Sequence, residues 1–191
     1  YSMRWMSLQT GAFLLSMSLV VSAANALTFL LAWELMAVTS WLLVITEHAR
    51  PDAVRGGLWY LAMTHMGLLA LLAAFFLLGG DQPGAWPFDA LRDRAGSLSP
   101  GTRNAIFLLA LLGFGSKAGL VPVHVWLPRA HPAAPSHVSA LMSAVMVKLG
   151  IYGLLRVALD LLGGGPAWWG VLLVAAGAFW EACRDRRVWA L

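Results

Sequence analysis

The sequence has 191 residues, of which 60% are hydrophobic and only 12% are charged. Soluble domains carry about 45–50% apolar and about 25% charged residues, so this composition excludes an ordinary soluble domain and indicates a membrane protein. The formal net charge of +4 comes from arginines that lie between apolar runs without forming a basic stripe, which argues against a nucleic-acid partner.

Long stretches of the chain are apolar enough to cross a bilayer. Four windows contain no Asp, Glu, Lys or Arg: Trp5–Trp33, Gly56–Gly80, Ala130–Val147 and Leu161–Trp180. A spanning helix needs about 20 mostly apolar residues, and backbone amides in hydrocarbon must bond within their own segment. The runs do not alternate as barrel strands do. We therefore predict an all-α polytopic bundle of about six transmembrane helices.

The predicted segments follow one another closely at the start of the chain. Asn25 marks a tight turn, and "EHARPDAVRG" is predicted to be a polar loop. "GDQPGAWP" and balanced charges predict a long loop over Gly80–Asn104, and "GGGP" separates the last two segments. The segments are Ser7–Ala23, Ala26–Thr46, Leu58–Leu78, one that starts at Ala105 and is broken after Leu120, Ser136–Arg156 and Ala167–Cys183.

The arginines predict an orientation. With the sides numbered alternately, seven arginines fall on the side of the N-terminus and four on the other. The first set is Arg4, Arg50, Arg55, Arg129, Arg184, Arg186 and Arg187, and the second is Arg92, Arg94, Arg103 and Arg156. The positive-inside rule places the first side in the cytoplasm.

Three ionisable residues lie inside apolar segments: Glu34, Lys117 and Lys148. A charge at the bilayer centre costs about 2.5–3.5 kcal/mol on insertion scales, and such residues usually mark ion or proton pathways. A buried ion pair or snorkelling to the interface is the structural alternative. Helical spacing places Lys148 on a stripe of small residues, so we expect it to face protein: Ser136, Ala140, Ala144, Lys148 and Tyr152.

Lys117 is also predicted to lie beside a break in its helix. Pro122 removes an amide donor, and Gly115 and Gly119 weaken the surrounding turns. Freed backbone groups at membrane depth are tolerated only against protein or water, and transporters build ion sites at such broken helices. A desolvated lysine near an acidic partner can load and release a proton, so the pattern favours a proton relay that needs no metal and no bound cofactor.

Histidines flank the predicted break. His124, His131 and His137 could pass protons near neutral pH, or His124 and His131 could bond backbone freed by the prolines. His65, in "AMTHMG", is a weaker candidate of the same kind. We expect no metal site, because no carboxylate or cysteine accompanies these histidines at ligand spacing. The single Cys183 likewise offers no disulfide or metal spacing.

The stretch "GFGSKAGLVPVHVWLPRAHPAAPSHVSALMSAVMVKLGIYGLLRV", residues 113–157, resembles the core of the antiporter-like proton-channel subunits. These are membrane subunits of respiratory complex I, Mrp-type antiporters and membrane-bound hydrogenases. "SKAG", "HVWLPRAHPAAPS" and "SALMS" are most similar to the hydrogenase-4 and formate hydrogenlyase branch, as are "AWELMAVTSWLLV" and "YLAMTHMG".

The resemblance implies a role for each intramembrane charge. Glu34 matches the glutamate of the family's fifth helix, Lys117 the lysine of its broken seventh and Lys148 the lysine of its eighth. In the family, opening and closing of the first pair drives proton transfer toward the third residue. The three histidines His124, His131 and His137 fall in the connecting region of that path.

The resemblance covers one repeat of a longer fold. Family members have about fourteen helices with two inverted five-helix repeats. Residues 1–157 resemble the first repeat, with the broken helix at 105–130, whereas residues 158–191 hold part of a further helix and an atypical basic tail. The chain is thus expected to be a partial chain, a truncated product or one piece of a split subunit.

The function implied is a proton-translocating subunit of a hydrogenase-type, complex I-related complex in a bacterial or archaeal cytoplasmic membrane. Its partners would be other membrane and peripheral subunits and the lipid bilayer. Redox chemistry would belong to those partners, because the chain has no cysteine cluster for iron–sulfur or nickel–iron ligation. Two alternatives remain open: an Mrp-type Na+/H+ antiporter subunit and an inactive membrane scaffold.

Overall fold

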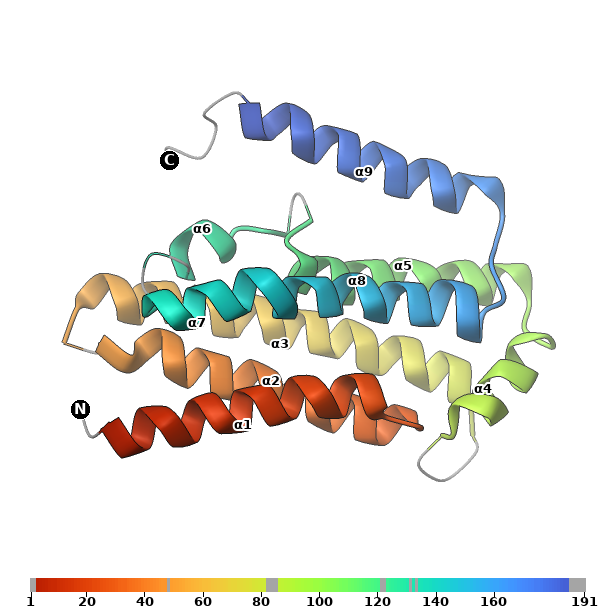
Figure 1. Ribbon diagram of the computed structural model, residues 1–191. Helices are drawn as coiled ribbons and strands as arrows, with labels where there is room; N and C mark the ends of the chain where they lie inside the picture. Colours follow the sequence, from red (N-terminus) through yellow and green to blue (C-terminus); the bar gives the residue numbers. More distant parts are fainter. Residues whose placement is uncertain are drawn as a thin grey trace.

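The computed structural model describes residues 3–47, 49–81, 86–120, 123–130, 132 and 134–185, and these form a bundle of helices (Figure 1). The all-α prediction is confirmed. The helices are α1 (Met3–Ser22), α2 (Ala26–Val44), α3 (Pro51–Gly79), α4 (Phe88–Ala95), α5 (Pro100–Ala118), α6 (Leu127–Ala130), α7 (Ser136–Leu141), α8 (Val147–Leu155) and α9 (Ala167–Asp185). A 3-10 turn at Ile45–Glu47 follows α2. A π-helical turn at Met142–Met146 joins α7 to α8, and a second at Arg156–Leu161 extends α8, so that these segments form one continuous helix that ends at Leu161.

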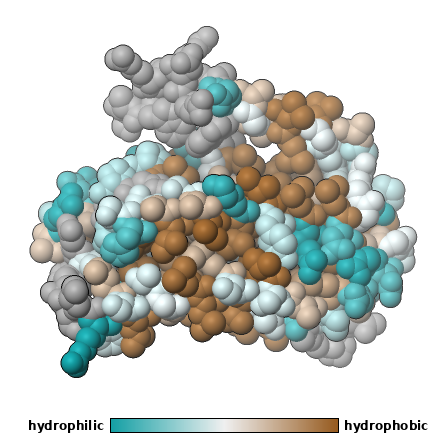
Figure 2. All heavy atoms as spheres, viewed as in Figure 1, coloured by the Kyte–Doolittle hydropathy of each residue, from teal (hydrophilic) through white to brown (hydrophobic). Residues whose placement is uncertain are grey.

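Within the described ranges, four helices are long and apolar enough to cross a membrane: Arg4–Ser22, Ala26–Val44, Pro51–Gly79 and Ser136–Leu161. Two other predicted segments form helices that fall short of that standard. Helix α5 carries Arg103 and Lys117, and the apolar part of α9 is shorter, Ala167–Phe179. Figure 2 shows apolar side chains gathered across the middle of the bundle, with hydrophilic residues toward its two ends. That distribution suits a bilayer around the middle of the helices.

Glycines let the central helices approach closely. A Cβ added to Gly67 on α3 would lie 2.5 Å from Ser116 Oγ and 3.1 Å from the Gly113 carbonyl oxygen on α5. A Cβ added to Gly150 on α8 would lie 2.8 Å from the backbone of α5 at Phe114 and at Ala118. Small residues at such contacts are what membrane helices use to pack. Helix α5 is therefore held between α3 and α8, and this fixes the position of its C-terminal turn.

The predicted loop over Gly80–Asn104 is wrong in its middle, because it contains α4 and the first turn of α5. Phe88, Leu91 and Ala95 lie on one face of α4 and are buried. The charged residues between these three positions make the segment resemble a loop in the sequence. Backbone hydrogen bonds then tie the approach to α4 to the α1–α2 turn, from Ala26 N to the Trp86 carbonyl oxygen at 3.0 Å and from Phe88 N to that of Ala24 at 3.1 Å.

Two predicted helix boundaries also differ from those in the structure. The third helix begins at Pro51 rather than Leu58, because proline fits the first helical position and Asp52 suits the first turn. The fifth predicted segment continues past Arg156 to Leu161, where Arg156 and Asp160 pair at 3.2 Å and Arg92 of α4 reaches Asp160 at 2.7 Å. The charges of Arg156 and Asp160 near the end of this segment are thus paired.

Helix α9 is attached to the bundle at its first turn. The Trp169 ring stacks on Phe107 of α5 with centroids 4.2 Å apart, and its indole N–H donates to Asn104 Oδ1 at 2.9 Å. Beyond this anchor, Leu172 and Leu173 still pack against the core, whereas Val171, Val174 and Phe179 are exposed.

Gly67→Ala should destabilise the bundle by about 1–3 kcal/mol, the usual cost of overpacking, because its methyl group would meet Ser116 and the α5 backbone. Unfolding in mixed micelles titrated with a denaturing detergent measures this. Gly11→Ala is the matched control, since nothing lies within 4 Å of a Cβ at Gly11. Equal stability of the two variants would contradict the close α3–α5 contact.

Candidate functional site

The helix break beside Lys117 is made by Gly119. Helix α5 ends at Ala118, and Gly119 adopts the left-handed conformation with φ of 77°. Leu120 N donates to the Gly115 carbonyl oxygen at 2.8 Å and Gly119 N to that of Ser116 at 3.4 Å, which is the paired bonding of a glycine-terminated helix. The prediction of a break here is confirmed, with Gly119 in the conformation that glycine favours. Pro122 lies outside the described residues.

Trp126 completes the end of α5 from the segment that follows the break. Its indole N–H donates to the Ser116 carbonyl oxygen at 2.6 Å, and its ring is fully buried. The ring meets Tyr60 of α3 edge-on, with centroids 4.9 Å apart. A carbonyl group at a helix end would otherwise be buried with a weak partner, so Trp126 stabilises the break and closes the site around Lys117.

Lys117 lies in the last turn of α5 and is 1% exposed. Its ammonium group donates a hydrogen bond to the Tyr60 hydroxyl oxygen at 2.9 Å. Tyr60 is in turn 2.6 Å from Ser40 Oγ on α2 and 3.5 Å from the Met146 sulfur in the π turn. Three helices and the turn between α7 and α8 therefore meet at this one lysine.

The hydrogen bonds around Lys117 have a fixed direction when the lysine is charged. An ammonium group can only donate, and backbone carbonyl groups can only accept. Ser40 Oγ lies 2.6 Å from the Met36 carbonyl oxygen, so the serine donates there and accepts from Tyr60. The chain runs from Lys117 through Tyr60 and Ser40 to a carbonyl, which takes up no proton. This arm therefore positions and solvates Lys117 rather than carrying its proton onward.

The surroundings of Lys117 both disfavour and favour its positive charge. Burial disfavours the ammonium form, and among the described residues no carboxylate lies within ion-pair distance of it. Its Nζ lies 5.0 Å from the Tyr60 ring centroid and 5.9 Å from that of Trp33, and the C-terminal end of α5 also attracts a cation. The opposing effects suit a lysine that exchanges a proton.

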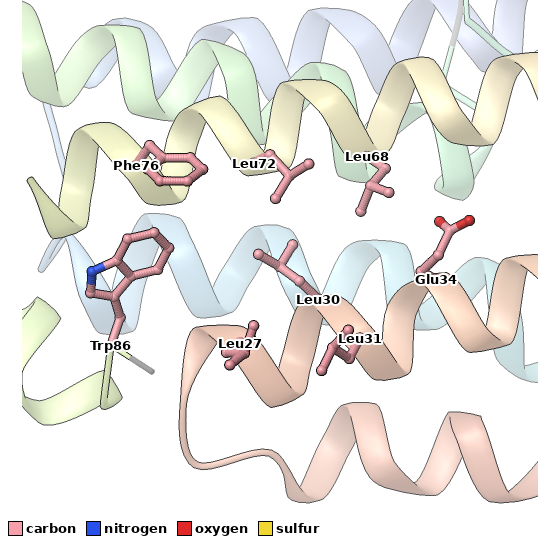
Figure 3. A pocket seen from close by; sticks show the side chains of 8 residues that line it. All are labelled: Leu27, Leu30, Leu31, Glu34, Leu68, Leu72, Phe76 and Trp86. Carbon is pink, nitrogen blue, oxygen red and sulfur yellow. The ribbon is translucent and has the colours of Figure 1, made fainter. Parts of the chain in front are cut away.

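Glu34 of α2 is not bonded to Lys117. Its Oε1 lies 3.0 Å from Nε2 of His65 on α3, while its charge still attracts Lys117 across the site. The glutamate closes one end of an apolar groove of about 310 Å³ between α2 and α3 (Figure 3). The groove is lined by Leu27, Leu30, Leu31, Glu34, Leu68, Leu72, Phe76 and Trp86.

Lys148 is exposed in this chain, so none of the described helices covers the face on which it is predicted to meet protein. The whole stripe of Ser136, Ala140, Ala144 and Lys148 is exposed, and residues of the other face are buried in its place: Val138, Met142 and Leu149. The Lys148 ammonium group donates to the Ser143 carbonyl oxygen at 3.0 Å. The structure therefore joins neither Glu34 nor Lys117 directly to Lys148.

The predicted histidine path is described only in part. His124 is partly buried between α5 and α6, His137 is exposed in the first turn of α7, and His131 lies outside the described residues. Among the residues that the structure describes, no group of three His, Cys, Asp or Glu side chains could hold a metal ion.

Sequence reasoning missed three residues of the site and underrated a fourth. Tyr60, Ser40 and Trp126 do not stand out in the sequence, although each brings a polar atom that must find a partner when buried. His65 was ranked below the other histidines. An ionisable residue inside an apolar run was the available signal, and "YLAMTHMG" holds both Tyr60 and His65.

Residues 23–179 match the family described as NADH:quinone oxidoreductase/Mrp antiporter, transmembrane. The chain belongs to this family. The match spans the helices from α2 to α9 and includes the break beside Lys117, so the predicted resemblance is confirmed at the level of the family.

Known members of the family are longer. An uncharacterized protein of Mycobacterium tuberculosis is 55% identical over 165 residues, which cover 86% of this chain and 25% of that protein. Hydrogenase-4 component B of Escherichia coli is 48% identical over 168 residues, which cover 87% of this chain and 24% of the relative. The chain thus spans about a quarter of the length of these curated relatives.

A solved structure shares the fold. In the Mrp complex from Dietzia sp., one chain superposes with a TM-score of 0.78 and 30% identity, over 88% of this chain and 18% of that one. The fold of this chain is therefore that of an antiporter-like membrane subunit.

Trp126→Phe should cost about 1–3 kcal/mol of stability, because it keeps a ring but leaves the buried Ser116 carbonyl without its indole donor. Unfolding in mixed micelles measures the loss. Trp5→Phe is the control, since Trp5 is 64% exposed. A loss no larger than that of the control would show that Trp126 does not hold the break.

Proposed function

We propose that this chain is a proton-translocating part of a membrane complex, in which Glu34, Lys117 and Lys148 relay protons. The observation that carries the proposal is the burial of Lys117 at a helix break, with a hydroxyl group and two aromatic rings as its partners. A lysine used only for structure would be expected to form an ion pair at such depth.

The two sides of Lys117 supply the other relay groups. On the α2–α3 side, Glu34 is near enough to attract Lys117 yet lies in contact with His65. On the other side, Gly150 of α8 packs against Ala118 of α5; Lys148 lies two residues earlier on the exposed face of that helix, so transfer to it needs a further step. Transfer then needs Glu34 to approach Lys117, which favours the charged lysine, and to withdraw, which favours release. His124, His131 and His137 are candidates for connecting groups near the break.

A proton suits this site better than a sodium ion. Sodium, a hard cation like calcium and magnesium, would need several oxygen ligands, whereas the centre of this site is an ammonium group that repels cations. The likeness to an Mrp complex supports the Mrp-type Na+/H+ antiporter as the second candidate. The difference between the two can be measured, because the antiporter requires Na+ for proton exchange.

We infer that the complex is of the hydrogenase type, on the strength of the likeness to hydrogenase-4 component B. Redox partners, other membrane subunits and the bilayer would then surround this chain in a bacterial or archaeal cytoplasmic membrane. Electron transfer would take place in those partners. The relay itself requires no resident cofactor, because lysine and carboxyl groups carry the protons.

Lys117→Arg should abolish proton uptake into sealed vesicles that carry the chain, because arginine keeps the positive charge but does not release its proton. A structural role for the charge predicts instead that arginine substitutes well. Arg55→Lys, an exchange of exposed cations at the start of α3, is the matched control and should leave uptake unchanged. Full uptake in Lys117→Arg would rule out the relay, and uptake that depends on Na+ would favour the antiporter.

Tyr60→Phe should slow proton uptake about tenfold or more, because a hydrogen bond to a charged group is worth about 1.5–3 kcal/mol. The ring and its packing on Trp126 remain in this variant. Tyr152→Phe is the control, since that hydroxyl donates to the Val21 carbonyl oxygen at 3.3 Å on α1. Equal rates in the two variants would mean that Tyr60 does not stabilise the charged lysine during transfer.

A further inference from the structure

His65 lies between two oxygen atoms. Its Nδ1 is 2.9 Å from the Leu61 carbonyl oxygen one turn earlier on α3, and its Nε2 is 3.0 Å from Glu34 Oε1 on α2. The imidazole therefore joins α3 to α2 through Glu34, the carboxylate at one end of the apolar groove.

These two contacts determine how many protons the His65–Glu34 pair holds. A carbonyl oxygen only accepts hydrogen bonds, so Nδ1 carries a hydrogen. A neutral ring with Nδ1–H has a lone pair at Nε2, which would repel an ionised carboxylate at 3.0 Å. One further proton must lie between the ring and Glu34, either on Nε2 or on the carboxyl group. In both arrangements the pair has no net charge.

The second oxygen of Glu34 has a different environment. Oε2 is buried and has no hydrogen-bond partner among the described residues. The charge of Glu34 also acts on Lys117 of α5 and Tyr60 of α3. One oxygen of the carboxylate is thus engaged by His65, while the other is ready to accept a hydrogen bond from a new donor.

We propose that Glu34 and His65 hold one exchangeable proton between them, and that His65 positions Glu34 away from Lys117 between transfer steps. This inference rests on the proposed relay function and names a group that controls it. When the proton is on Nε2, its loss breaks the Nε2–H bond, the nitrogen keeps the electron pair and the proton passes to water on the exposed side of the His65 ring. The contact to Oε1 is then lost, and the free carboxylate is attracted to the charged Lys117. Uptake of a proton by His65 draws Glu34 back and lets Lys117 release its own.

Counting the protons on the pair tests the proposal directly. The chain has five histidines, so 15N-histidine labelling gives few signals, and the signal lost in His65→Gln identifies His65. Nitrogen NMR in lipid vesicles reports both ring nitrogens, and infrared difference spectroscopy against Glu34→Gln reports the protonated carboxyl group. We expect Nδ1–H throughout, one proton shared by Nε2 and Glu34, and its loss from both groups at one midpoint of pH. An imidazole ring without a hydrogen on Nδ1 would overturn the proposal, and so would separate loss of protons from His65 and from Glu34.

Proton uptake gives the second readout. His65→Gln keeps a hydrogen-bond donor for Glu34 but holds no extra proton, so uptake should slow on the order of a hundredfold, as for loss of a positioned proton-transfer group. The part of the pH dependence of uptake that comes from the shared proton should also disappear in this variant. Met66→Gln, on the same exposed side of α3, is the control. Unchanged rate and pH profile in His65→Gln would refute the role of His65.

The two proposals fail in distinguishable ways. If uptake by the unchanged chain does not depend on Lys117, the relay itself is wrong, and the spectroscopic proton count still decides whether Glu34 and His65 share a proton. If uptake depends on Lys117 but not on His65, the relay stands and the positioning role of His65 falls.

Discussion

The burial of one lysine is the constraint on which the arrangement of this site depends. Lys117 is 1% exposed at the end of α5, and its hydrogen bond to Tyr60 links α5 to α3 and, through Ser40, to α2. The lysine can lie there because glycines bring α3, α5 and α8 within backbone contact and because the helix ends immediately after it. Burial disfavours its charge, while the hydroxyl group, the aromatic rings and the helix end favour it, and a small change nearby can therefore shift the balance.

Glu34 is the group best placed to make that change. The structure holds it on His65, at the surface between α2 and α3, and leaves its second oxygen buried without a hydrogen-bond partner among the described residues. Two ionisable centres thus lie side by side, each with its own partner: Glu34 with His65, and Lys117 with Tyr60. In the proposed relay, the centres exchange protons because a move of Glu34 changes the electrostatic free energy of both. Tyr60 and Ser40 keep the lysine in place, since their hydrogen bonds end at a carbonyl group.

The sequence alone could predict the membrane helices, the break and the three intramembrane charges, because each depends on local composition. An apolar run as long as the bilayer predicts a helix, and Gly119 predicts its end. The partners of those charges depend on how helices pack, which spacing alone does not determine. Tyr60 and Ser40 meet Lys117 across three helices, and His65 displaces the expected partner of Glu34. The spacing of small residues predicts a packed face for Lys148, but in this chain that stripe is exposed and residues of the other face, such as Val138 and Leu149, are buried.

The charge of Lys117 in the membrane is the most direct test of the central claim. The chain contains two lysines, so 15N-lysine labelling gives one side-chain signal for Lys117 and one for Lys148, and the signal lost in Lys117→Arg identifies Lys117. Nitrogen NMR of the chain in lipid vesicles should show Lys117 passing between ammonium and neutral amine as the pH changes, and Glu34→Gln should shift that transition. A Lys117 signal that remains that of a fully charged ammonium group, whatever the state of Glu34, would contradict the account.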